Sequence, residues 1–149
     1  MGKGTGLRTI GGPARELVAA GLREPVAIAA AAKGAAYVLS REGGTLDEVE
    51  IANGELRRVA EGLSLPEALA VGPGGDLLVL EEGARRIQSI DPRSGARRTL
   101  ASDLPLGLDA GPTLGPGEPL SGLAVGGDGT LYFTSDRRDA LYAIGPPQR

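Results

Sequence analysis

The sequence predicts an all-β protein built from a repeated sheet of four short antiparallel strands. Three observations support this prediction: a repeat of 41 residues, frequent turn sequences rich in Gly, Pro and Asp, and short apolar runs between them. Four strands in about 40–45 residues is the spacing of one blade of a β-propeller. We therefore expect residues 1–149 to form a single domain that contains three propeller blades.

The first two copies of the repeat align without a gap. Residues 21–61 match residues 62–102 at 11 of 41 positions, and apolar positions agree more often than identical ones. Gly21 corresponds to Gly62, for example, and Val49 corresponds to Ile90 in apolar character. These two copies are expected to form two complete blades.

A third copy begins further along the chain. Residues 122–126, Gly-Leu-Ala-Val-Gly, match residues 68–72, Ala-Leu-Ala-Val-Gly, at a separation of 54 instead of 41. The 13 extra residues fall within 105–120, a stretch rich in Gly and Pro that is typical of an irregular loop. The third copy then covers residues 121–145, which suffice for three strands.

The second copy shows how one repeat is expected to fold. It predicts strands over residues 67–71, 76–80, 86–90 and 96–101, with turns such as Gly-Pro-Gly-Gly between them. Small residues fill the first strand and arginines the fourth, which suits a crowded axis and an exposed outer edge. A β-sandwich or barrel is the main alternative, but it would not require a gapless repeat.

The composition excludes several classes of function. The chain has no His and no Cys, so imidazole base catalysis, disulfides, thiolate metal sites and a Cys nucleophile are absent. A net charge of -3, with 16 basic and 19 acidic residues, is not that of a nucleic-acid-binding protein. No apolar stretch approaches the about 20 residues of a membrane span, and no signal peptide is visible. We expect no membrane contact, with the cytoplasm as the default location.

Several stretches resemble known propeller repeats. Residues 65–79, Leu-Pro-Glu-Ala-Leu-Ala-Val-Gly-Pro-Gly-Gly-Asp-Leu-Leu-Val, resemble the NHL repeat, and residues 86–91 look like its third strand. Residues 121–136 are similar to gluconolactonase-like and virginiamycin-lyase-like propellers. The resemblance implies an NHL-repeat or SMP-30/gluconolactonase-like six-bladed β-propeller, of which this chain would form half.

The activities of these families do not carry over onto matching residues. The gluconolactonase-like enzymes hold a divalent metal through Glu, Asn and Asp, whereas the single Asn here, Asn53, lies in an Asn-Gly hairpin turn. The lyase-like propellers rely on a His, and this chain has none. We therefore assign no catalytic residue and no metal ligand.

The two ends of the sequence look like the two halves of one blade. Residues 14–20 align with residues 55–61, the fourth strand of the first copy, whereas the third copy lacks such a strand. Three blades do not close a ring of the usual about four to eight, and an open arc exposes apolar faces. We expect a homodimeric six-bladed ring in which residues 14–20 complete the partner's last blade, a strand-exchanged closure. The alternative is that the chain is a piece of a longer propeller.

The candidate ligand site lies at the mouth of the central channel. The sequence places five polar residues on the loops of that face: Glu24, Glu67, Ser121, Glu81 and Asp136. Each also has a structural explanation, such as a solvated carboxylate or a capped turn. No spacing marks a metal loop, so we expect no cofactor, with a divalent cation such as calcium as the alternative.

Two functions from different classes follow. The first is a non-enzymatic β-propeller scaffold or binding module that forms a homodimer and binds an unidentified small molecule or protein. The alternative is a metal-assisted lactonase or hydrolase of the gluconolactonase type, with its site in the central channel. The lack of matching catalytic residues favours the first, so we expect that the protein is not an enzyme.

Overall fold

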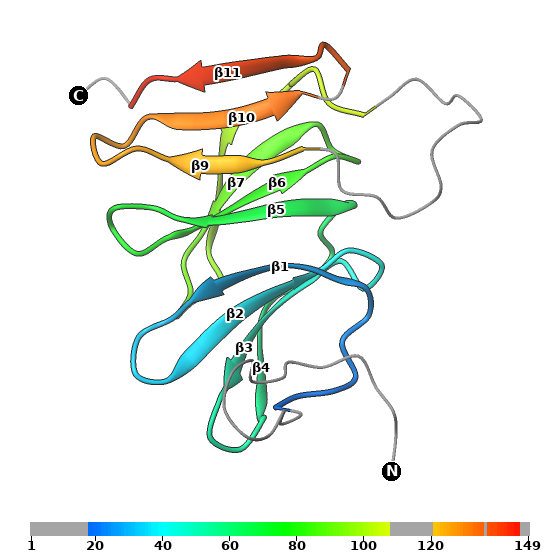
Figure 1. Cartoon of the computed structure of the whole chain (residues 1–149), viewed down its shortest axis with the longest axis vertical. Helices are drawn as coiled ribbons and strands as arrows, with labels where there is room; N and C mark the ends of the chain where they lie inside the picture. The colour runs from blue at the N-terminus through cyan, green and yellow to red at the C-terminus, as the bar shows by residue number, and fades with distance from the viewer. Residues whose placement is uncertain (1–17, 108–120, 136, 147–149) are drawn as a thin grey trace, which may run out of the picture.

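The structure is a computed structural model in which residues 18–107, 121–135 and 137–146 are described. These residues form eleven strands and no helix, arranged as two four-stranded sheets and one three-stranded sheet (Figure 1). Each sheet is an antiparallel meander of consecutive strands. The all-β prediction and the two complete blades are confirmed.

The first two sheets coincide with the first two repeats. Blade 1 contains β1 (Pro25–Ala30), β2 (Ala35–Ser40), β3 (Thr45–Glu50) and β4 (Leu56–Ala60). Blade 2 contains β5 (Pro66–Val71), β6 (Leu77–Glu81), β7 (Arg86–Ile90) and β8 (Arg97–Ala101). The strands predicted for the second copy are therefore correct to within one residue at each end.

The two blades share one hydrogen-bonding register. Leu39 lies opposite Leu46 in blade 1, and Leu80 lies opposite Ile87 in blade 2. The fourth strand of each blade joins its neighbour through an irregularity at the same place in the repeat. Such a bulge bends the strand and increases its twist. Positions one repeat apart therefore have the same backbone surroundings and can be compared directly.

Blade 3 has three described strands. These are β9 (Leu123–Val125), β10 (Leu131–Ser135) and β11 (Ala140–Ile144), in the order β11-β10-β9. Of the fourth strand expected at residues 14–20, residues 14–17 lie outside the described part, and residues 18–20 are not in a strand. Most of the predicted 105–120 loop also lies outside the described residues. The described part of blade 3 is thus a sheet of three strands, the number expected within residues 121–145.

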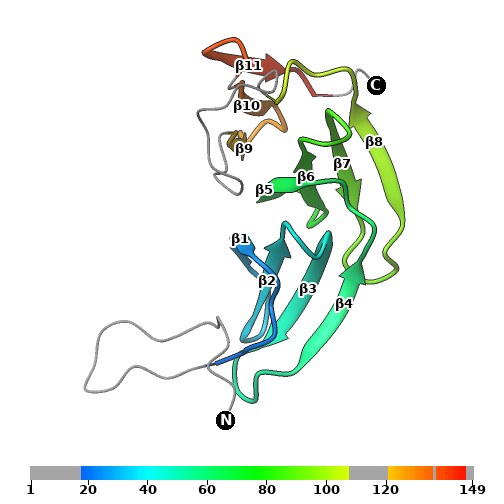
Figure 2. The ribbon, with the colours of Figure 1, turned by 90° about the vertical axis from the view of Figure 1, so that its right-hand side faces the viewer.

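The blades stand side by side in a curved stack. Figure 2 shows β1, β5 and β9 along its concave side, with β4 and β8 along its convex side. The first strands contact one another in the order β1, β5, β9. Small side chains such as Ala29 and Ala70 therefore lie where neighbouring strands are crowded, as the sequence predicted.

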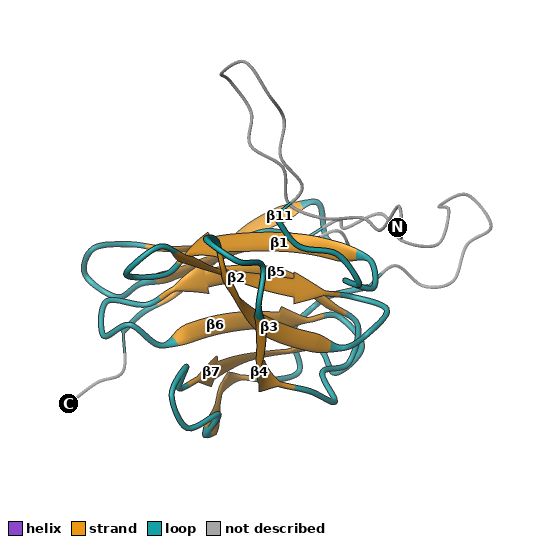
Figure 3. Ribbon diagram, turned by 90° about the horizontal axis from the view of Figure 1, so that it is seen from below, coloured by secondary structure: helices purple, strands orange, loops and turns teal. Residues whose placement is uncertain are grey.

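Two apolar cores hold the three blades together. Successive side chains of a strand point to opposite faces of its sheet. One set of residues in each blade therefore faces the preceding blade, and the other set faces the following blade. In blade 2, Leu77 and Val79 pack toward blade 1, whereas Leu78 and Leu80 pack toward blade 3. The loops emerge at the two ends of these layered sheets (Figure 3). Both cores lie between blades. The polar residues of the loops at the two ends of the blades take no part in these cores and are therefore the residues among which to look for a site.

Candidate functional site

Loops that lead into first strands, and loops that join second to third strands, emerge at the same end of the blades. Four of the five expected site residues are described, and all four lie at this end. Glu24 precedes β1, Glu67 is the second residue of β5, Glu81 ends β6, and Ser121 precedes β9. Asp136 lies outside the described residues. We refer to this end of the blades as the loop face.

Arg41, which follows β2, joins blades 1 and 2 at the loop face. Its Nη2 atom lies 2.9 Å from Oε2 of Glu82 and 3.8 Å from Oε1 of Glu67. The side chain of Glu67 is 1% exposed, and those of Arg41 and Glu82 are 14% and 21% exposed. Buried charges are stable only when they are paired. The three residues therefore form an ionic cluster that ties the two blades together.

The surroundings of Glu82 in this cluster lower its pKa. The hydrogen bond with Glu67 lowers the pKa of Glu82, and the hydrogen bond and charge of Arg41 lower it further, while burial opposes them. Arg41 thus lies close enough to neutralise the charge of Glu82, at a distance of 2.9 Å.

Three further polar atoms at the loop face are buried without a hydrogen bond to any described residue. They are Oγ of Ser40, Nε of Arg41 and Oγ of Ser121. Ser121 stands in blade 3 at the position that Glu67 has in blade 2. Buried polar atoms ordinarily have partners. The loop face therefore combines the charged cluster around Arg41 with buried polar atoms from blades 1 and 3.

Glu24 shapes the loop face through its backbone rather than through its side chain. Glu24 has a left-handed φ of 55°, and its carbonyl oxygen accepts a 2.9 Å hydrogen bond from the N–H of Arg41. One repeat later, Leu65 has a φ of 44° and accepts a 3.1 Å hydrogen bond from the N–H of Glu82. This position of the repeat thus forms a turn that binds the backbone of Arg41 in blade 1 and of Glu82 in blade 2. The turn forms with a polar side chain at Glu24 and with an apolar one at Leu65.

Glu81 stabilises its own blade. It is fully buried, its Oε2 atom lies 2.7 Å from Nε of Arg86, and its Oε1 atom accepts a 2.9 Å hydrogen bond from the N–H of Ser64. In blade 3 the equivalent Ser135 donates a hydrogen bond to the carbonyl oxygen of Pro105. Both side chains join the end of a second strand to the linker that leads into the blade. Both carboxylate oxygens of Glu81 are therefore engaged within blade 2.

Arg41 and Glu82 are functional candidates that the sequence-based set omitted. They lie one repeat apart, so they occupy the same position in neighbouring blades with opposite charges. That combination could have indicated an ion pair between blades, because equivalent loops of adjacent blades lie side by side.

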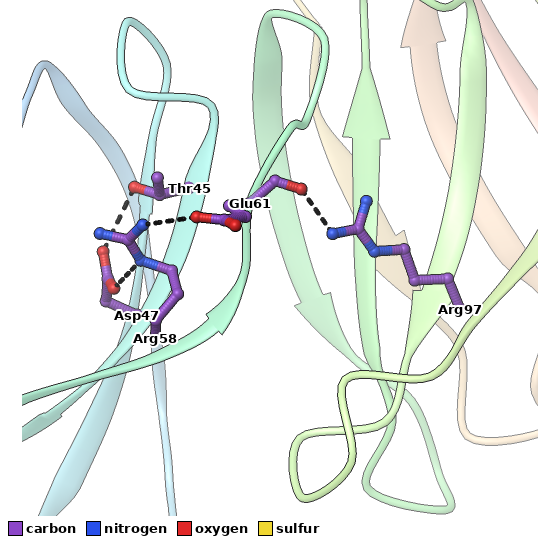
Figure 4. Close-up of polar contacts among 5 residues, drawn as sticks. All are labelled: Thr45, Asp47, Arg58, Glu61 and Arg97. Carbon is purple, nitrogen blue, oxygen red and sulfur yellow. Dashed lines mark hydrogen bonds and ion pairs between the residues drawn. The ribbon is translucent and has the colours of Figure 1, made fainter.

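A second polar network joins the outer strands of blades 1 and 2 (Figure 4). In blade 1, Nε of Arg58 lies 2.6 Å from Oδ1 of Asp47, which also accepts a hydrogen bond from Thr45 through its other oxygen. Nη1 of Arg58 lies 3.4 Å from Oε2 of Glu61. The backbone carbonyl oxygen of Glu61 accepts a hydrogen bond from Arg97 of blade 2. These arginines are engaged within the protein, so the network supports the blades.

A groove of about 740 Å³ lies between blades 1 and 2, at the end opposite the loop face. Tyr37, Glu48 and Arg57 are among its lining residues. Burial, followed by the charge and hydrogen bond of Glu48, raises the pKa of Tyr37. Arg57 donates hydrogen bonds to Glu48 at 3.0 Å and to the carbonyl oxygen of Pro92 at 2.9 Å. The side chains of Tyr37, Glu48 and Arg57 thus interact within the protein, and none of the four described site residues lines this groove.

The described ranges contain neither a metal-binding cluster of acidic side chains nor a membrane-spanning helix. No three acidic side chains there converge as the ligands of a metal ion would. The same ranges contain no helix with the length and hydropathy of a membrane span.

Comparison with known proteins identifies the fold. No protein-family model and no curated protein matches the chain. Among solved structures, a chain of the nidogen–laminin complex is similar with a TM-score of 0.68 and 18% identity, over 89% of this chain and 48% of that one. Virginiamycin B lyase from Staphylococcus aureus is similar with a TM-score of 0.54 and 14% identity, over 84% and 42% of the two chains. A gluconolactonase from Xanthomonas campestris is similar with a TM-score of 0.56 and 17% identity, over 75% of this chain and 40% of that one.

These similarities confirm the resemblance to NHL-like, virginiamycin-lyase-like and gluconolactonase-like propellers at the level of the fold. The chain spans about half the length of each solved structure. At such low identity the likeness concerns architecture alone, since one fold supports many activities.

Proposed function

We propose that this propeller chain is a non-enzymatic scaffold or binding module that closes into a six-bladed ring with a second copy of itself. The ring would present the loop face of both copies, with the polar cluster at Arg41, around one channel mouth. The observation that carries the proposal is the outward face of blade 3, described next.

Blade 3 exposes the side of its sheet that points away from blade 2. The residues at these positions are all exposed and uncharged: Ala124, Tyr132, Thr134, Leu141 and Ala143. Their equivalents in blade 2 face blade 3, and the contrast is largest for Leu141, which is 69% exposed where Ile87 is 0% exposed. An uncharged, partly apolar sheet face of this kind is typical of a surface that another protein covers.

Blade 1 exposes apolar surface at the other end of the stack. Ile28 is 56% exposed, whereas the equivalent residues Leu69 and Leu123 pack into the cores between blades. By this comparison, Ile28 points to where a preceding blade would stand. The faces of blades 1 and 3 are therefore the two sides of a blade-to-blade contact.

A second copy of the chain would cover the exposed faces of blade 1 and blade 3 at the same time. In a two-fold dimer, blade 3 of each copy would cover blade 1 of the other, so both contacts form with the same geometry. Two arcs of three blades give six blades. This number agrees with the chain spanning 40–48% of the three propeller structures compared.

The mass in solution tests the proposal. We expect a dimer at micromolar concentration by sedimentation or light scattering, and a monomer for Leu141→Glu, because burying a charge in the contact is costly. Val71→Glu is the matched control, since Val71 is an exposed apolar residue of blade 2. A monomeric wild-type protein, or an equal loss of dimer in both variants, would overturn the proposal.

The metal-assisted hydrolase alternative has a separate readout. Arg41 lies 2.9 Å from Glu82 and 3.8 Å from Glu67, so its positive charge offsets the negative charge that this cluster would offer to a cation. We therefore expect no stoichiometric metal in elemental analysis of the dialysed protein, and no lactone hydrolysis. A retained divalent ion together with lactonase activity would replace the scaffold proposal with the hydrolase.

A further inference from the structure

The linker that leads into blade 1 has the backbone conformation of the linkers that lead into blades 2 and 3. Gly21, Gly62 and Asp103 occupy the same position in the three linkers, with left-handed φ values of 82°, 70° and 53°. Asp103 adopts this conformation despite its Cβ atom, which shows that the position imposes it. The turn at Gly21 therefore has the conformation of its counterparts at Gly62 and Asp103.

The side chains of this linker also pack like their counterparts. The core between blades 1 and 2 contains residues from the end of β4 and from the linker that follows it: Val59, Ala60 and Leu63. Their counterparts form a third cluster with two residues of blade 1: Val18, Ala19 and Leu22 pack with Val38 and Val49. The linker thus lies on blade 1 as the end of β4 lies on blade 2.

Two glycines provide an independent check of this equivalence. A methyl group added at Gly54 would collide with the carbonyl oxygen of Val18, and one added at Gly95 would lie 2.9 Å from the carbonyl oxygen of Val59. Gly54 and Gly95 are one repeat apart, as are Val18 and Val59. The backbone before blade 1 therefore follows the path of a fourth strand as it leaves a preceding blade.

The strand that should pair with this path is β11. Its counterparts β3 and β7 each pair with a fourth strand, whereas β11 pairs only with β10 among the described residues. Leu46 lies opposite Ala60 in blade 1, and Ile87 lies opposite Ala101 in blade 2. The counterpart of Leu46 and Ile87 in β11 is Leu141, and the counterpart of the two alanines is Ala19.

We propose that β11 of one copy pairs with the segment that ends at the partner's Ala19, with Leu141 directly opposite that residue. This register rests on the proposed ring and adds to it the geometry of strand exchange. Leu141 would join the cluster of the partner's Ala19, Val38 and Val49, as Leu46 shares a cluster with Ala60, Val79 and Ile90 between blades 1 and 2. The junction between copies is then a blade-to-blade core like the other two, assembled from both chains.

Cysteine cross-linking tests this register. The chain contains no Cys, so an introduced pair is the only source of a disulfide. Residues opposite each other in antiparallel strands have Cα atoms about 4.5–5.5 Å apart, within the about 4.4–6.8 Å that a disulfide spans. Ala19→Cys and Leu141→Cys are prepared separately, refolded together and oxidised. We expect a disulfide-linked species of twice the chain mass, several-fold more abundant in the mixture than in either variant alone.

Ala143→Cys is the matched register control, because it lies two residues further along the same face of β11. Preferential cross-linking of Ala19→Cys with Ala143→Cys would overturn the register. A dimeric wild-type protein in which Ala19→Cys and Leu141→Cys do not cross-link would overturn the register and leave the ring intact. A monomeric wild-type protein would overturn both proposals.

Amide hydrogen exchange on the unmodified protein provides a second measurement that no substitution can disturb. Pairing of both edges predicts that the amides of β11 are protected as strongly as those of β7. Rapid exchange along β11 in a dimeric protein would contradict the strand pairing, whatever the cysteine variants show.

Discussion

Arg41 and Glu82 occupy the same position in consecutive repeats, and a 2.9 Å ion pair joins them across blades 1 and 2. Sequence repeats usually place similar residues in similar surroundings. Here the two surroundings are adjacent, so opposite charges at one repeat position bind each other. Glu67 completes the cluster, 3.8 Å from Arg41. The contact between these blades therefore depends on charge as well as on apolar packing.

Arg41→Met is expected to destabilise the chain by removing the cation from this cluster. The substitution leaves Glu82 with reduced solvation and no counter-charge, which predicts a loss of about 2–3 kcal/mol in the free energy of unfolding by urea. Arg23→Met is the control, because the pair of Arg23 with Glu42 is exposed and is expected to contribute less than about 1 kcal/mol. Equal losses in the two variants would show that burial does not strengthen the Arg41 pair.

Acid is expected to weaken the wild-type protein more than a Glu82→Gln variant. The hydrogen bond with Glu67, and then Arg41, lower the pKa of Glu82 below its ordinary value of 4.5. The unfolded chain therefore takes up this proton first as pH falls, so the contribution of Glu82 is present above about pH 4.5 and is lost below it. Thermal unfolding of both proteins from neutral pH to pH 3 should show their difference shrinking. A difference that is constant across this range would contradict the assignment.

Ile87 and Leu141 are equivalent positions that should respond differently to truncation. Ile87→Ala opens a cavity in a formed core and should cost about 2–5 kcal/mol at every protein concentration. Leu141→Ala removes a side chain that is exposed in the single chain, so we expect it to weaken association. Its effect on the melting temperature should then vary with protein concentration. A concentration-independent effect of Leu141→Ala would argue against a role in the dimer contact.

Gly54→Ala is expected to disturb the linker before blade 1. Gly54 has a φ of 74°, which costs a non-glycine residue about 1–2 kcal/mol, and its new methyl group would collide with the carbonyl oxygen of Val18. Gly34→Ala is the control, because its φ is 78° and its nearest neighbour is a flexible Glu50 side chain at 3.9 Å. Gly54→Ala should cost more stability in urea and should reduce cross-linking between Ala19→Cys and Leu141→Cys. Equal behaviour of the two variants would contradict the seating of Val18 on Gly54.

The strands were predictable because their signals are local. Turns separate consecutive strands at sequences such as Gly-Pro-Gly-Gly and Asp-Pro-Arg-Ser-Gly. The apolar runs between these turns have the length of propeller strands. The observed β7, Arg86–Ile90, has the predicted bounds. The prediction for residues 14–20 was less complete, since residues 18–20 form no strand and the others lie outside the described part.

The candidate site was predictable in position and not in its contacts. Glu67 and Glu81 were both expected on the loop face, and the structure places both there. The burial of Glu81 with Arg86, and the meeting of Glu67 with Arg41 and Glu82, depend on where side chains from different strands converge. No pattern within a single repeat carries that information.

The sequence by itself determined the blade: its period, its four strands, its turns and the alternation that gives each sheet two apolar faces. These properties arise from backbone preferences and side-chain alternation over a few residues, so one repeat suffices to encode them. Only the tertiary structure decided which face of each blade is buried and which charges meet. Leu141 and Ile87 have the same place in the repeat, yet one is exposed and the other is buried. Burial depends on whether a neighbouring blade is present, and that is a property of the stack of blades.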